Sequence, residues 1–316
     1  MLMADIRLAK MKKIKNISVI GAGLMGHGIS LKFAQSNLNV KVFDNNKDSL
    51  STLIERIKIS FSQMGVLEGD IMKYIKNISS SNDLKYVVAN ADFVIEAVPE
   101  KLELKQDLFF EIEKYVSEET LIASNTSVIP ITKIVDKLKN KTRALGTHWW
   151  NPPHLVPLVE VIKTKWTDEY YINSVMDTLK NIGKIPVRVE KDIPGFIGNR
   201  LQHALWREAI SLVENDVCDA QAVDTVIKSS FGRRLAVLGP MENADLVGTD
   251  LTLDVHENVL YDLESSKEPS KLLRKLVNDG KLGMKNGEGF QKWSPEEMNK
   301  TKEKVSSHLK SLEKIL

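Results

Sequence analysis

A glycine-rich turn near the amino terminus is the feature that most constrains the fold of this chain. The stretch Gly21–Gly26 reads G-A-G-L-M-G, and it joins the β-branched run Asn16–Ile20 to a helical pattern over Leu24–Asn37. In such a turn the first glycine permits a sharp bend, the second lets a pyrophosphate approach the backbone, and the third lets helix and strand pack closely. The helix start adds free N–H groups and a partial positive charge. The pattern predicts a dinucleotide-binding loop made of Gly21, Gly23, Leu24, Met25 and Gly26.

An aspartate ends the next predicted strand, at the distance from the turn that dinucleotide binding requires. Asp44 closes the run Val40–Asp44, and its carboxylate can accept both ribose hydroxyls while repelling a 2′-phosphate. Asn45 and Asn46 follow, and neither is an arginine that could receive that phosphate. The sequence therefore predicts NAD rather than NADP. The nicotinamide end should reach the carboxyl ends of the later strands.

Strand and helix patterns alternate along the first part of the chain. Apolar or β-branched runs indicate further strands at 93–97, 121–124, 143–147, 156–162 and 186–189. Helical patterns fill most of the intervals, including a long region over 47–77 that is interrupted near 65–69. Alternation of this kind predicts a doubly wound parallel sheet with helices on both faces. We therefore expect an α/β Rossmann domain over residues 14–191.

The pattern changes at Asp192-Ile193-Pro194-Gly195. Beyond this point the sequence shows helical periodicity over 196–215, 220–230, 251–263, 271–279 and 295–316, without a convincing strand. We expect a second, smaller, all-helical domain over residues 192–316, and a loose tail over residues 1–13.

The composition is that of a soluble globular protein: 42% of the 316 residues are apolar and 27% are charged, with a formal net charge of +2. Because the positive charges form no block, we expect no nucleic-acid partner. No apolar run is long enough for a transmembrane helix or a signal-peptide core, so we expect no membrane partner and a cytoplasmic location. Cys218 is the single cysteine, which fits a reducing compartment, and no His/Cys cluster has metal-ligand spacing.

Polar residues follow the later predicted strands, where the nicotinamide end of the cofactor should lie. They are Glu100, Asn125, Ser127 and His148. Oxidation of an alcohol needs a base for the hydroxyl proton and donors for the product oxygen. An imidazole titrates near neutrality, so His148 is the candidate base, and Glu160 could hold its other ring nitrogen. Ser127 and Asn199 could donate hydrogen bonds to the substrate oxygen.

Most of these side chains also have a structural explanation. His148, which stands beside two tryptophans, could be a hydrogen-bonded core residue, and Ser127 could bond to the backbone near a following helix. Asn199 could cap the first turn of its helix. Glu160 is harder to explain in this way, because a carboxylate in an apolar strand needs a partner. His27 lies in the predicted cofactor helix and has a weaker claim to a catalytic role.

Several motifs in one order resemble those of the 3-hydroxyacyl-CoA dehydrogenase family, along nearly the whole chain from about Lys15 to Trp293. The resembling stretches are Gly21–Gly26, Glu96–Glu100, Ser124–Ser127, His148–Pro152, Leu158–Val161, Pro194–Arg200 and Gly283–Phe290. The resemblance implies a Rossmann domain followed by a helical domain, NAD as the cofactor, and a homodimer formed through the helical domain. It also implies NAD-dependent oxidation of a short-chain L-3-hydroxyacyl-CoA to the 3-oxoacyl-CoA, as in fatty acid metabolism.

The resemblance further implies roles for individual residues. His148 corresponds to the catalytic base of the family and Glu160 to the acid paired with it. Ser127 and Asn199 correspond to the residues that hold the 3-oxygen of the substrate, and Asp44 corresponds to the ribose ligand. The residues that correspond to nicotinamide-side contacts are Glu100, Lys105 and Asn125.

The substrate is less constrained than the reaction. CoA-using members carry a lysine-rich segment after the second strand, whereas residues 47–77 here mix lysines and Arg56 with acidic residues. The stretch Gly232–Pro240 and the surroundings of Asn151 resemble the free-acid branch of the family, which includes L-gulonate 3-dehydrogenase and carnitine dehydrogenase. Arg233 or Arg234 could bind a free carboxylate through two parallel hydrogen bonds, although surface arginines at a helix end would look the same. Residues 280–290 resemble the CoA-using branch instead, so both substrate classes stay open.

A non-catalytic NAD-binding or structural protein is the alternative of another class. Such a protein would need none of the four residues assigned to chemistry. Their joint presence favours an enzyme that acts on a small-molecule substrate.

Overall fold

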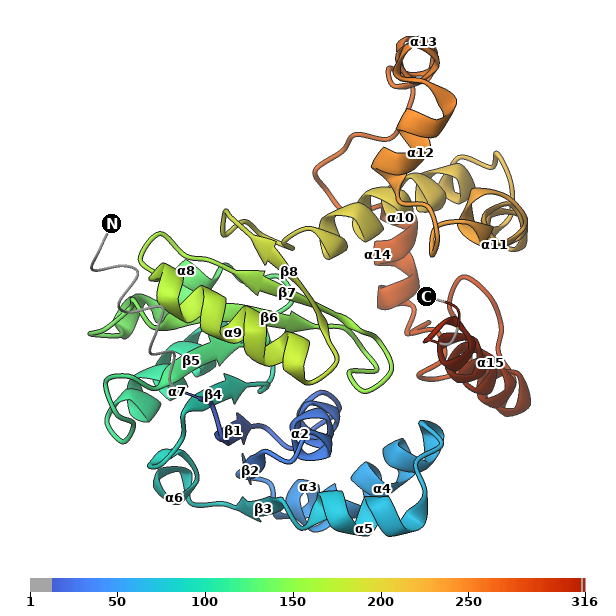
Figure 1. The fold of residues 1–316 in the computed structure, drawn as a ribbon. Helices are drawn as coiled ribbons and strands as arrows, with labels where there is room; N and C mark the ends of the chain where they lie inside the picture. The colour runs from blue at the N-terminus through green and yellow to red at the C-terminus, as the bar shows by residue number, and fades with distance from the viewer. Residues whose placement is uncertain (1–12, 314, 316) are drawn as a thin grey trace. The chain divides into compact units, whose positions relative to one another are not determined.

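A computed structural model describes residues 13–313 and 315 (Figure 1). The tail expected over residues 1–13 lies, except for Lys13, outside the described residues. The chain forms a first unit that ends at Arg200 and a second unit that begins at Leu201. Residues 192–200 are held in the first unit: the carboxylate of Asp192 accepts hydrogen bonds from the backbone N–H groups of Ile131 and Thr132, and Phe196 is fully buried. The division between the two units lies after Arg200.

The first unit is built on an eight-stranded sheet with the order β3-β2-β1-β4-β5-β6-β7-β8. The strands are β1 Asn16–Ile20, β2 Asn39–Phe43, β3 Ile78–Ser81, β4 Phe93–Glu96, β5 Leu121–Ser124, β6 Ala144–Trp149, β7 Leu158–Ile162 and β8 Ile185–Val189. All neighbouring strands are parallel except β6 and β7. The loop of residues 150–157 that joins this pair is too short for the crossover that parallel strands need. The predicted Rossmann sheet is confirmed, with one strand pair antiparallel.

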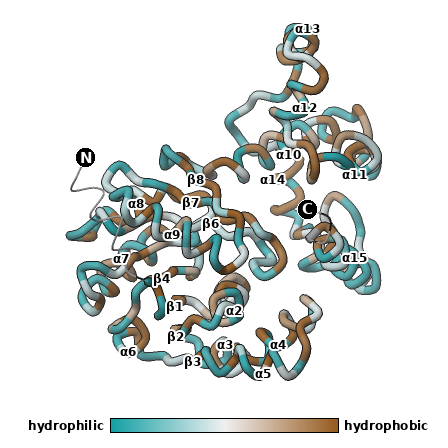
Figure 2. The backbone as a smooth tube through the Cα atoms, in the orientation of Figure 1, coloured by the Kyte–Doolittle hydropathy of each residue, from teal (hydrophilic) through white to brown (hydrophobic). Residues whose placement is uncertain are grey.

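Helices cover both faces of this sheet, and two apolar clusters fill the layers between. The helices are α2 Gly26–Gln35, α3 Lys47–Ser51, α4 Leu53–Gln63, α5 Glu68–Ile75, α6 Leu84–Val88, α7 Leu102–Glu113, α8 Ile131–Ile134 and α9 Glu169–Asn181, with a 3-10 turn η1 Val135–Lys137. Along β4, Phe93 and Ile95 belong to one cluster and Val94 to the other, because successive side chains point to opposite faces. Figure 2 shows apolar residues along the strands of this unit. Burial of each such side chain contributes about 1.5–3 kcal/mol to stability.

Two short elements of the first unit have no counterpart in the sequence prediction. Strand β3 contains Ile78 and three serines, and it is half exposed at the sheet edge, so it shows no β-type pattern and depends on pairing with β2. Helix α6 starts at a cap formed by Asp83, whose side chain accepts a hydrogen bond from Tyr86 N at 3.1 Å.

The second unit is helical, as predicted. Its helices are α10 Gly198–Glu214, which begins in the first unit, α11 Ala220–Ser229, α12 Pro240–Val247, α13 Thr249–Val259, α14 Lys271–Asn278 and α15 Pro295–Glu313, with a 3-10 turn η2 Phe231–Arg233. Helix α12 was not predicted, although Gly239, Pro240 and Glu242 form a helix-start signature: the Glu242 carboxylate accepts a hydrogen bond from Gly239 N at 2.7 Å. Among the described helices, none has both the length and the apolar character needed to cross a bilayer.

Candidate active site

The glycine-rich turn leaves β1 in the middle of the sheet. Gly21 has a φ of +108°, and a Cβ atom there would lie 2.6 Å from the carbonyl oxygen of Ala97. A Cβ at Gly26 would lie 1.7 Å from the carbonyl oxygen of Gly21, so only glycine lets α2 start this close to the strand. A Cβ at Gly23 would meet no atom within 4 Å. The turn is closed on its strand side and open at Gly23, which fits a loop that receives a pyrophosphate.

Asp44 follows β2 and is tied to the same turn. One carboxylate oxygen accepts a hydrogen bond from Ala22 N at 2.7 Å, and the other accepts one from Asn46 N at 2.8 Å. Each oxygen keeps a further lone pair, so a ribose hydroxyl can still be bound. Leu24, whose side chain is 67% exposed, and the half-buried Met25 complete the predicted loop. The residues present fit the nucleotide part of NAD.

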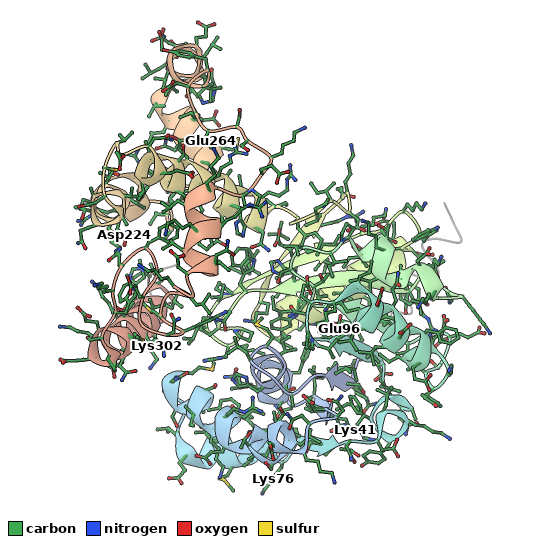
Figure 3. All side chains as sticks on the ribbon, turned by 180° about the vertical axis from the view of Figure 1, so that it is seen from behind. Lys41, Lys76, Glu96, Asp224, Glu264 and Lys302 are labelled. Atoms are coloured by element: carbon green, nitrogen blue, oxygen red, sulfur yellow. The ribbon has the colours of Figure 1, made fainter. Side chains whose placement is uncertain are left out.

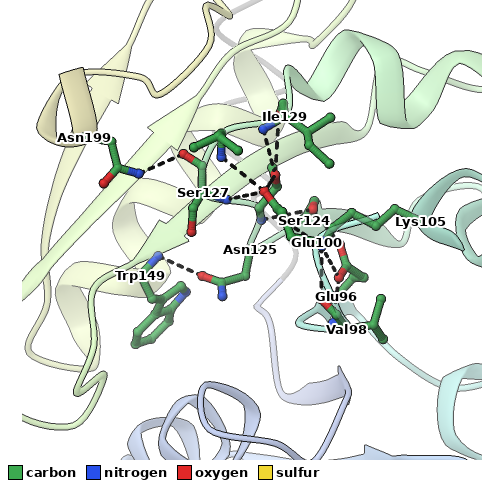
Figure 4. A network of polar contacts seen from close by, with 12 residues as sticks. Glu96, Val98, Glu100, Lys105, Ser124, Asn125, Ser127, Ile129, Trp149 and Asn199 are labelled. Carbon is green, nitrogen blue, oxygen red and sulfur yellow. Dashed lines mark hydrogen bonds and ion pairs between the residues drawn. The ribbon is translucent and has the colours of Figure 1, made fainter. Parts of the chain in front are cut away.

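A buried ion pair between Glu96 and Lys105 lies at the carboxyl end of β4. Glu96 ends β4 inside the first unit, and its residue is 0% exposed (Figure 3). Its carboxylate accepts hydrogen bonds from Lys105 Nζ at 2.6 Å, from Ser124 Oγ at 2.5 Å and from Val98 N at 2.7 Å (Figure 4). Burial raises the pKa of Glu96, and the ammonium of Lys105 acts in the opposite direction. Glu96 thus fastens β4 to both β5 and α7.

Lys105 was predicted to contact the cofactor, and the structure buries it to 1% exposure. Besides Glu96, its ammonium contacts Glu100 Oε2 at 3.2 Å and the carbonyl oxygen of Val98 at 3.3 Å. These three acceptors match the three N–H donors of a lysine. Glu96 itself had no role in the sequence prediction. The sequence did contain an indication of its role, because an acidic residue at the end of an apolar strand needs a partner when it is buried.

Glu100 organises the loop after β5. Its Oε1 atom accepts hydrogen bonds from Thr126 Oγ1 at 2.5 Å, Ser127 N at 3.0 Å and Val128 N at 3.2 Å (Figure 4). Burial acts to raise the pKa of Glu100, but these hydrogen bonds and the nearby ammonium lower it overall. From the other side, Asn199 Nδ2 donates to the carbonyl oxygen of Ser127 at 2.9 Å. The backbone of Ser127 is therefore fixed on both sides, while the residue itself is exposed.

The antiparallel pairing of β6 and β7 sets His148 directly opposite Glu160. His148 Nδ1 lies 2.7 Å from Glu160 Oε2, and the two side chains are 5% and 1% exposed. The second oxygen of Glu160 accepts hydrogen bonds from Ile197 N at 2.8 Å and Gly198 N at 3.0 Å. Burial acts to raise the pKa of Glu160, but the hydrogen bonds from His148 and from the two backbone N–H groups lower it overall.

Aromatic rings enclose the imidazole of His148. The rings of Trp150 and Phe196 have centroids 5.3 and 5.6 Å from it. A Cβ at Gly198 would lie 2.4 Å from Trp150 Cζ2, so the glycine leaves room for the indole. One residue before Trp150, the backbone N–H of Trp149 donates to Asn125 Oδ1 at 2.8 Å, which ties β6 to the end of β5.

The predicted residues of the first unit form three hydrogen-bonded groups: Asp44 with the glycine-rich turn, His148 with Glu160, and a group around Glu100 that holds Lys105, Asn125, Ser127 and Asn199. Asn151 belongs to none of them. Asn151 is exposed in the loop after β6, at a cis peptide bond with Pro152. Arg233 and Arg234 belong to the second unit, in η2 and directly after it, and both are exposed.

Two family models match the chain. The NAD-binding domain of 3-hydroxyacyl-CoA dehydrogenase matches residues 16–193, and the C-terminal domain of the same family matches residues 195–293. A 5-formyl-3-hydroxy-2-methylpyridine 4-carboxylate 5-dehydrogenase from Mesorhizobium japonicum is 33% identical over 96% of this chain and 98% of that relative. The mitochondrial hydroxyacyl-coenzyme A dehydrogenase of Sus scrofa is 36% identical over 90% of this chain and 93% of that relative.

A solved structure agrees with these matches. The crystal structure of a 5-formyl-3-hydroxy-2-methylpyridine 4-carboxylic acid 5-dehydrogenase, described as an NAD⁺-dependent dismutase, superposes with a TM-score of 0.89 at 32% identity, over 96% of this chain and 98% of that one. Because the family models and the relatives match nearly its whole length, the chain belongs to the 3-hydroxyacyl-CoA dehydrogenase family and is an NAD-dependent dehydrogenase that acts on a CH–OH group.

Proposed function

We propose that this chain oxidises the 3-hydroxyl group of an L-3-hydroxyacyl substrate to a ketone, with His148 as the general base. The observation that carries the proposal is the 2.7 Å contact between His148 Nδ1 and Glu160 Oε2. A buried imidazole–carboxylate pair costs desolvation, and a protein that only bound NAD would not need it. Its position at the end of β6, one strand beyond the loop that Glu100 organises, supports a role at the nicotinamide end.

Glu160 determines which ring nitrogen of His148 carries the hydrogen. Because the pKa of Glu160 is lowered, the carboxylate is ionised near neutral pH and keeps a proton on Nδ1 of His148. Nε2 is then the lone-pair nitrogen that can take the hydroxyl proton of the substrate. The imidazolium formed in this step stays beside the carboxylate, which stabilises its charge. Bound NAD would supply the hydride acceptor for the alcohol carbon.

Ser127 and Asn199 are proposed to hold the substrate oxygen. The exposed Ser127 is fixed through its backbone, so its hydroxyl can turn towards a ligand at little entropic cost. Asn199 uses one N–H on the carbonyl of Ser127 and keeps its second N–H for the substrate. Two donors at the oxygen would stabilise negative charge that develops there.

NAD is proposed to lie along the carboxyl ends of the strands. The residues proposed to hold its nucleotide part are Gly21, Gly23, Leu24, Met25, Gly26 and Asp44. At the nicotinamide end we propose direct contacts from Glu100 and Asn125. Lys105 would act through Glu100, because its ammonium already has three acceptors within the protein.

An L-3-hydroxyacyl-CoA is the first candidate substrate, because relatives such as the Sus scrofa enzyme carry this activity in their names. A free acid is the second candidate, and one observation favours it. The Mesorhizobium japonicum relative, whose name gives a carboxylate and no CoA, matches 96% of this chain, whereas the Sus scrofa enzyme matches 90%. Arg233 or Arg234 would then bind the carboxylate. A hydrated aldehyde also presents a CH–OH group, so the same base could act on it.

Turnover with matched substrates tests both candidates. We would follow NADH formation with L-3-hydroxybutyryl-CoA and, in parallel, with free L-3-hydroxybutyrate, L-gulonate and L-carnitine. Turnover of the CoA ester alone supports the first candidate. Turnover of a free acid that Arg234→Ala abolishes, and that the control Arg274→Ala leaves intact, supports the second. A His148→Ala protein that binds NADH but turns over at the wild-type rate would refute the assignment of the base.

We also propose that the second unit forms a homodimer. None of the described residues after Arg200 is buried, and large apolar side chains such as Tyr261, Met241 and Val237 are 83%, 73% and 72% exposed. Apolar surface on this scale is typical of an obligate interface. Light scattering of the wild type should give twice the chain mass, and Tyr261→Glu should lower the measured mass towards that of a monomer. A wild-type mass equal to one chain at micromolar concentration would refute the proposal.

A further inference from the structure

Helix α4 turns one polar face toward the cofactor turn. Arg56, Ser60 and Gln63 stand at positions i, i+4 and i+7, which lie on the same side of a helix. Ser60 Oγ lies 3.2 Å from His27 Nε2 in α2, and Gln63 Oε1 lies 3.2 Å from His154 Nε2 in the loop after β6. Arg56 reaches the glycine-rich turn itself. Helix α4 packs beside α2 (Figure 1). The polar contacts of α4 therefore join it to α2 and to the loop after β6.

Arg56 binds both carbonyl groups of the open part of the turn. Its Nη2 atom donates to the carbonyl oxygens of Ala22 and Ser49, each at 2.7 Å, and its Nη1 atom donates to the carbonyl oxygen of Gly23 at 3.3 Å. Burial lowers the pKa of Arg56, and Asp44 opposes this effect, so the guanidinium keeps its charge. The sequence did not indicate that this arginine reaches the cofactor turn.

The position of these carbonyls determines where the N–H groups of the turn point. In a trans peptide the C=O and N–H bonds lie in one plane and point in opposite directions. The carbonyl of Ala22 shares its peptide with the N–H of Gly23, and the carbonyl of Gly23 shares its peptide with the N–H of Leu24. Because Arg56 holds both carbonyls on one side, both N–H groups face the other side. At Gly23 itself a Cβ would meet no atom within 4 Å, so the turn is open at the residue between these two peptides.

His27 reinforces the same arrangement. Its Nδ1 atom lies 3.1 Å from the carbonyl oxygen of Gly23, while Nε2 contacts Ser60. Burial lowers the pKa of His27, and Arg56 adds to this effect, so the ring is neutral and can donate from Nδ1 to the carbonyl. The carbonyl of Gly23 therefore accepts from both side chains.

We propose that Arg56, with His27 as its partner, is a positioning residue for the cofactor. It fixes the peptide planes of Ala22–Gly23 and Gly23–Leu24 so that their N–H groups are preorganised for the pyrophosphate, and its charge lies behind them. The proposal concerns the binding of NAD, and it holds whatever the substrate and the base are.

Equilibrium titration with NADH, followed by fluorescence without substrate, tests the proposal. Arg56→Met should weaken NADH binding at least about tenfold, because two or more hydrogen bonds from a charged donor are lost. Arg56→Lys should also weaken it, because a lysine keeps the charge but lacks the planar fork that spans three carbonyls. The matched control Lys58→Met, on the same helix, should bind NADH like the wild type. At saturating NAD, kcat of the Arg56 variants should stay within about threefold of the wild type.

A second pair of variants separates positioning from folding. His27→Leu should weaken NADH binding, and His27→Asn, whose amide can still donate to the carbonyl of Gly23, should restore most of it. This pair and Arg56→Lys decide the question if Arg56→Met does not fold by circular dichroism. Wild-type affinity in Arg56→Met, full affinity in Arg56→Lys, or equal affinity in the two His27 variants would each overturn the proposal.

Discussion

The stability of the first unit should fall steeply in mild acid because of His154. This residue is 7% exposed, its Nε2 atom contacts Gln63, and its ring centroid lies 6.2 Å from that of His27. Burial, followed by repulsion from His27, Lys184 and Lys32, lowers the pKa of His154 to about 4 from an ordinary value of 6.5. Between pH 6.5 and about pH 4, His154 is mostly protonated in the unfolded chain and mostly neutral in the folded chain. Stability is therefore retained above pH 6.5 and is lost as the pH falls towards 4.

The size of the effect follows from the two pKa values. For one group with these values, unfolding should become about 2 kcal/mol easier at pH 5 than at pH 7.5, and about 3 kcal/mol easier near pH 4. The pKa of His27 is also lowered, first by burial, so His27 adds to the loss in the same direction. Urea unfolding between pH 5 and 7.5, followed by tryptophan fluorescence, measures the change, since Trp149, Trp150 and Trp166 lie in the first unit.

A variant of His154 isolates the contribution of this residue to the pH dependence of stability. His154→Gln keeps a donor near the position of Nε2 but cannot be protonated, so it should lose most of the pH dependence while it stays folded at pH 7. His308→Gln, at an exposed position of α15, is the matched control and should unfold with the wild-type pH dependence. If His154→Gln lost stability between pH 7.5 and 5 as steeply as the wild type, the electrostatic argument would be refuted.

Three further changes test other parts of the first unit. Glu160→Gln should lower kcat by roughly 10²–10⁴-fold with little change in NADH affinity, because the base loses its orienting partner; unchanged kcat in steady-state assays would contradict this. Lys105→Met leaves the fully buried Glu96 without its cation and should cost about 3–5 kcal/mol in urea unfolding, whereas a loss below 1 kcal/mol would show that Glu96 relaxes freely. Gly26→Ala should abolish NADH binding in a titration, because backbone lies 1.7 Å from the new Cβ, while Gly69→Ala, with open space around it, should bind normally.

The fold could be predicted where a segment carries its own pattern. Strands such as Leu121–Ser124 and helices such as Glu169–Asn181 are marked by apolar periodicity, and the glycine-rich turn fixes where the sheet begins. Strand β3 could not be found in this way, because three of its four residues are serines and its pairing with β2 alone makes it a strand. The antiparallel direction of β7 was predictable in principle from the short connection after Trp149, which leaves no room for a helix.

The candidate site was predictable to the extent that its residues follow strands. His148, Asn125 and Ser127 come at or directly after strand ends that share one edge of the sheet, so their proximity follows from the topology. The roles of Arg56 and Glu96 were not predicted, for two different reasons. Arg56 lies 34 residues after Ala22, whose carbonyl it binds, and its role depends on how α4 packs, which no local pattern encodes. Glu96 could have been identified from the cost of burying a carboxylate.

The pairing of β6 with β7 makes the geometry of the His148–Glu160 pair independent of the loop that joins the two strands. His148 and Glu160 are cross-strand partners, so their distance depends on the register of the two strands and not on the length of the loop between them. A single-residue insertion inside either strand would turn one of the two side chains to the opposite face. Insertions or deletions beside the exposed Asn151 leave that register intact, whereas residues 153–155 of the same loop are buried and would be disturbed by them. A change beside Asn151 can therefore alter the surface of this loop without moving His148 relative to Glu160.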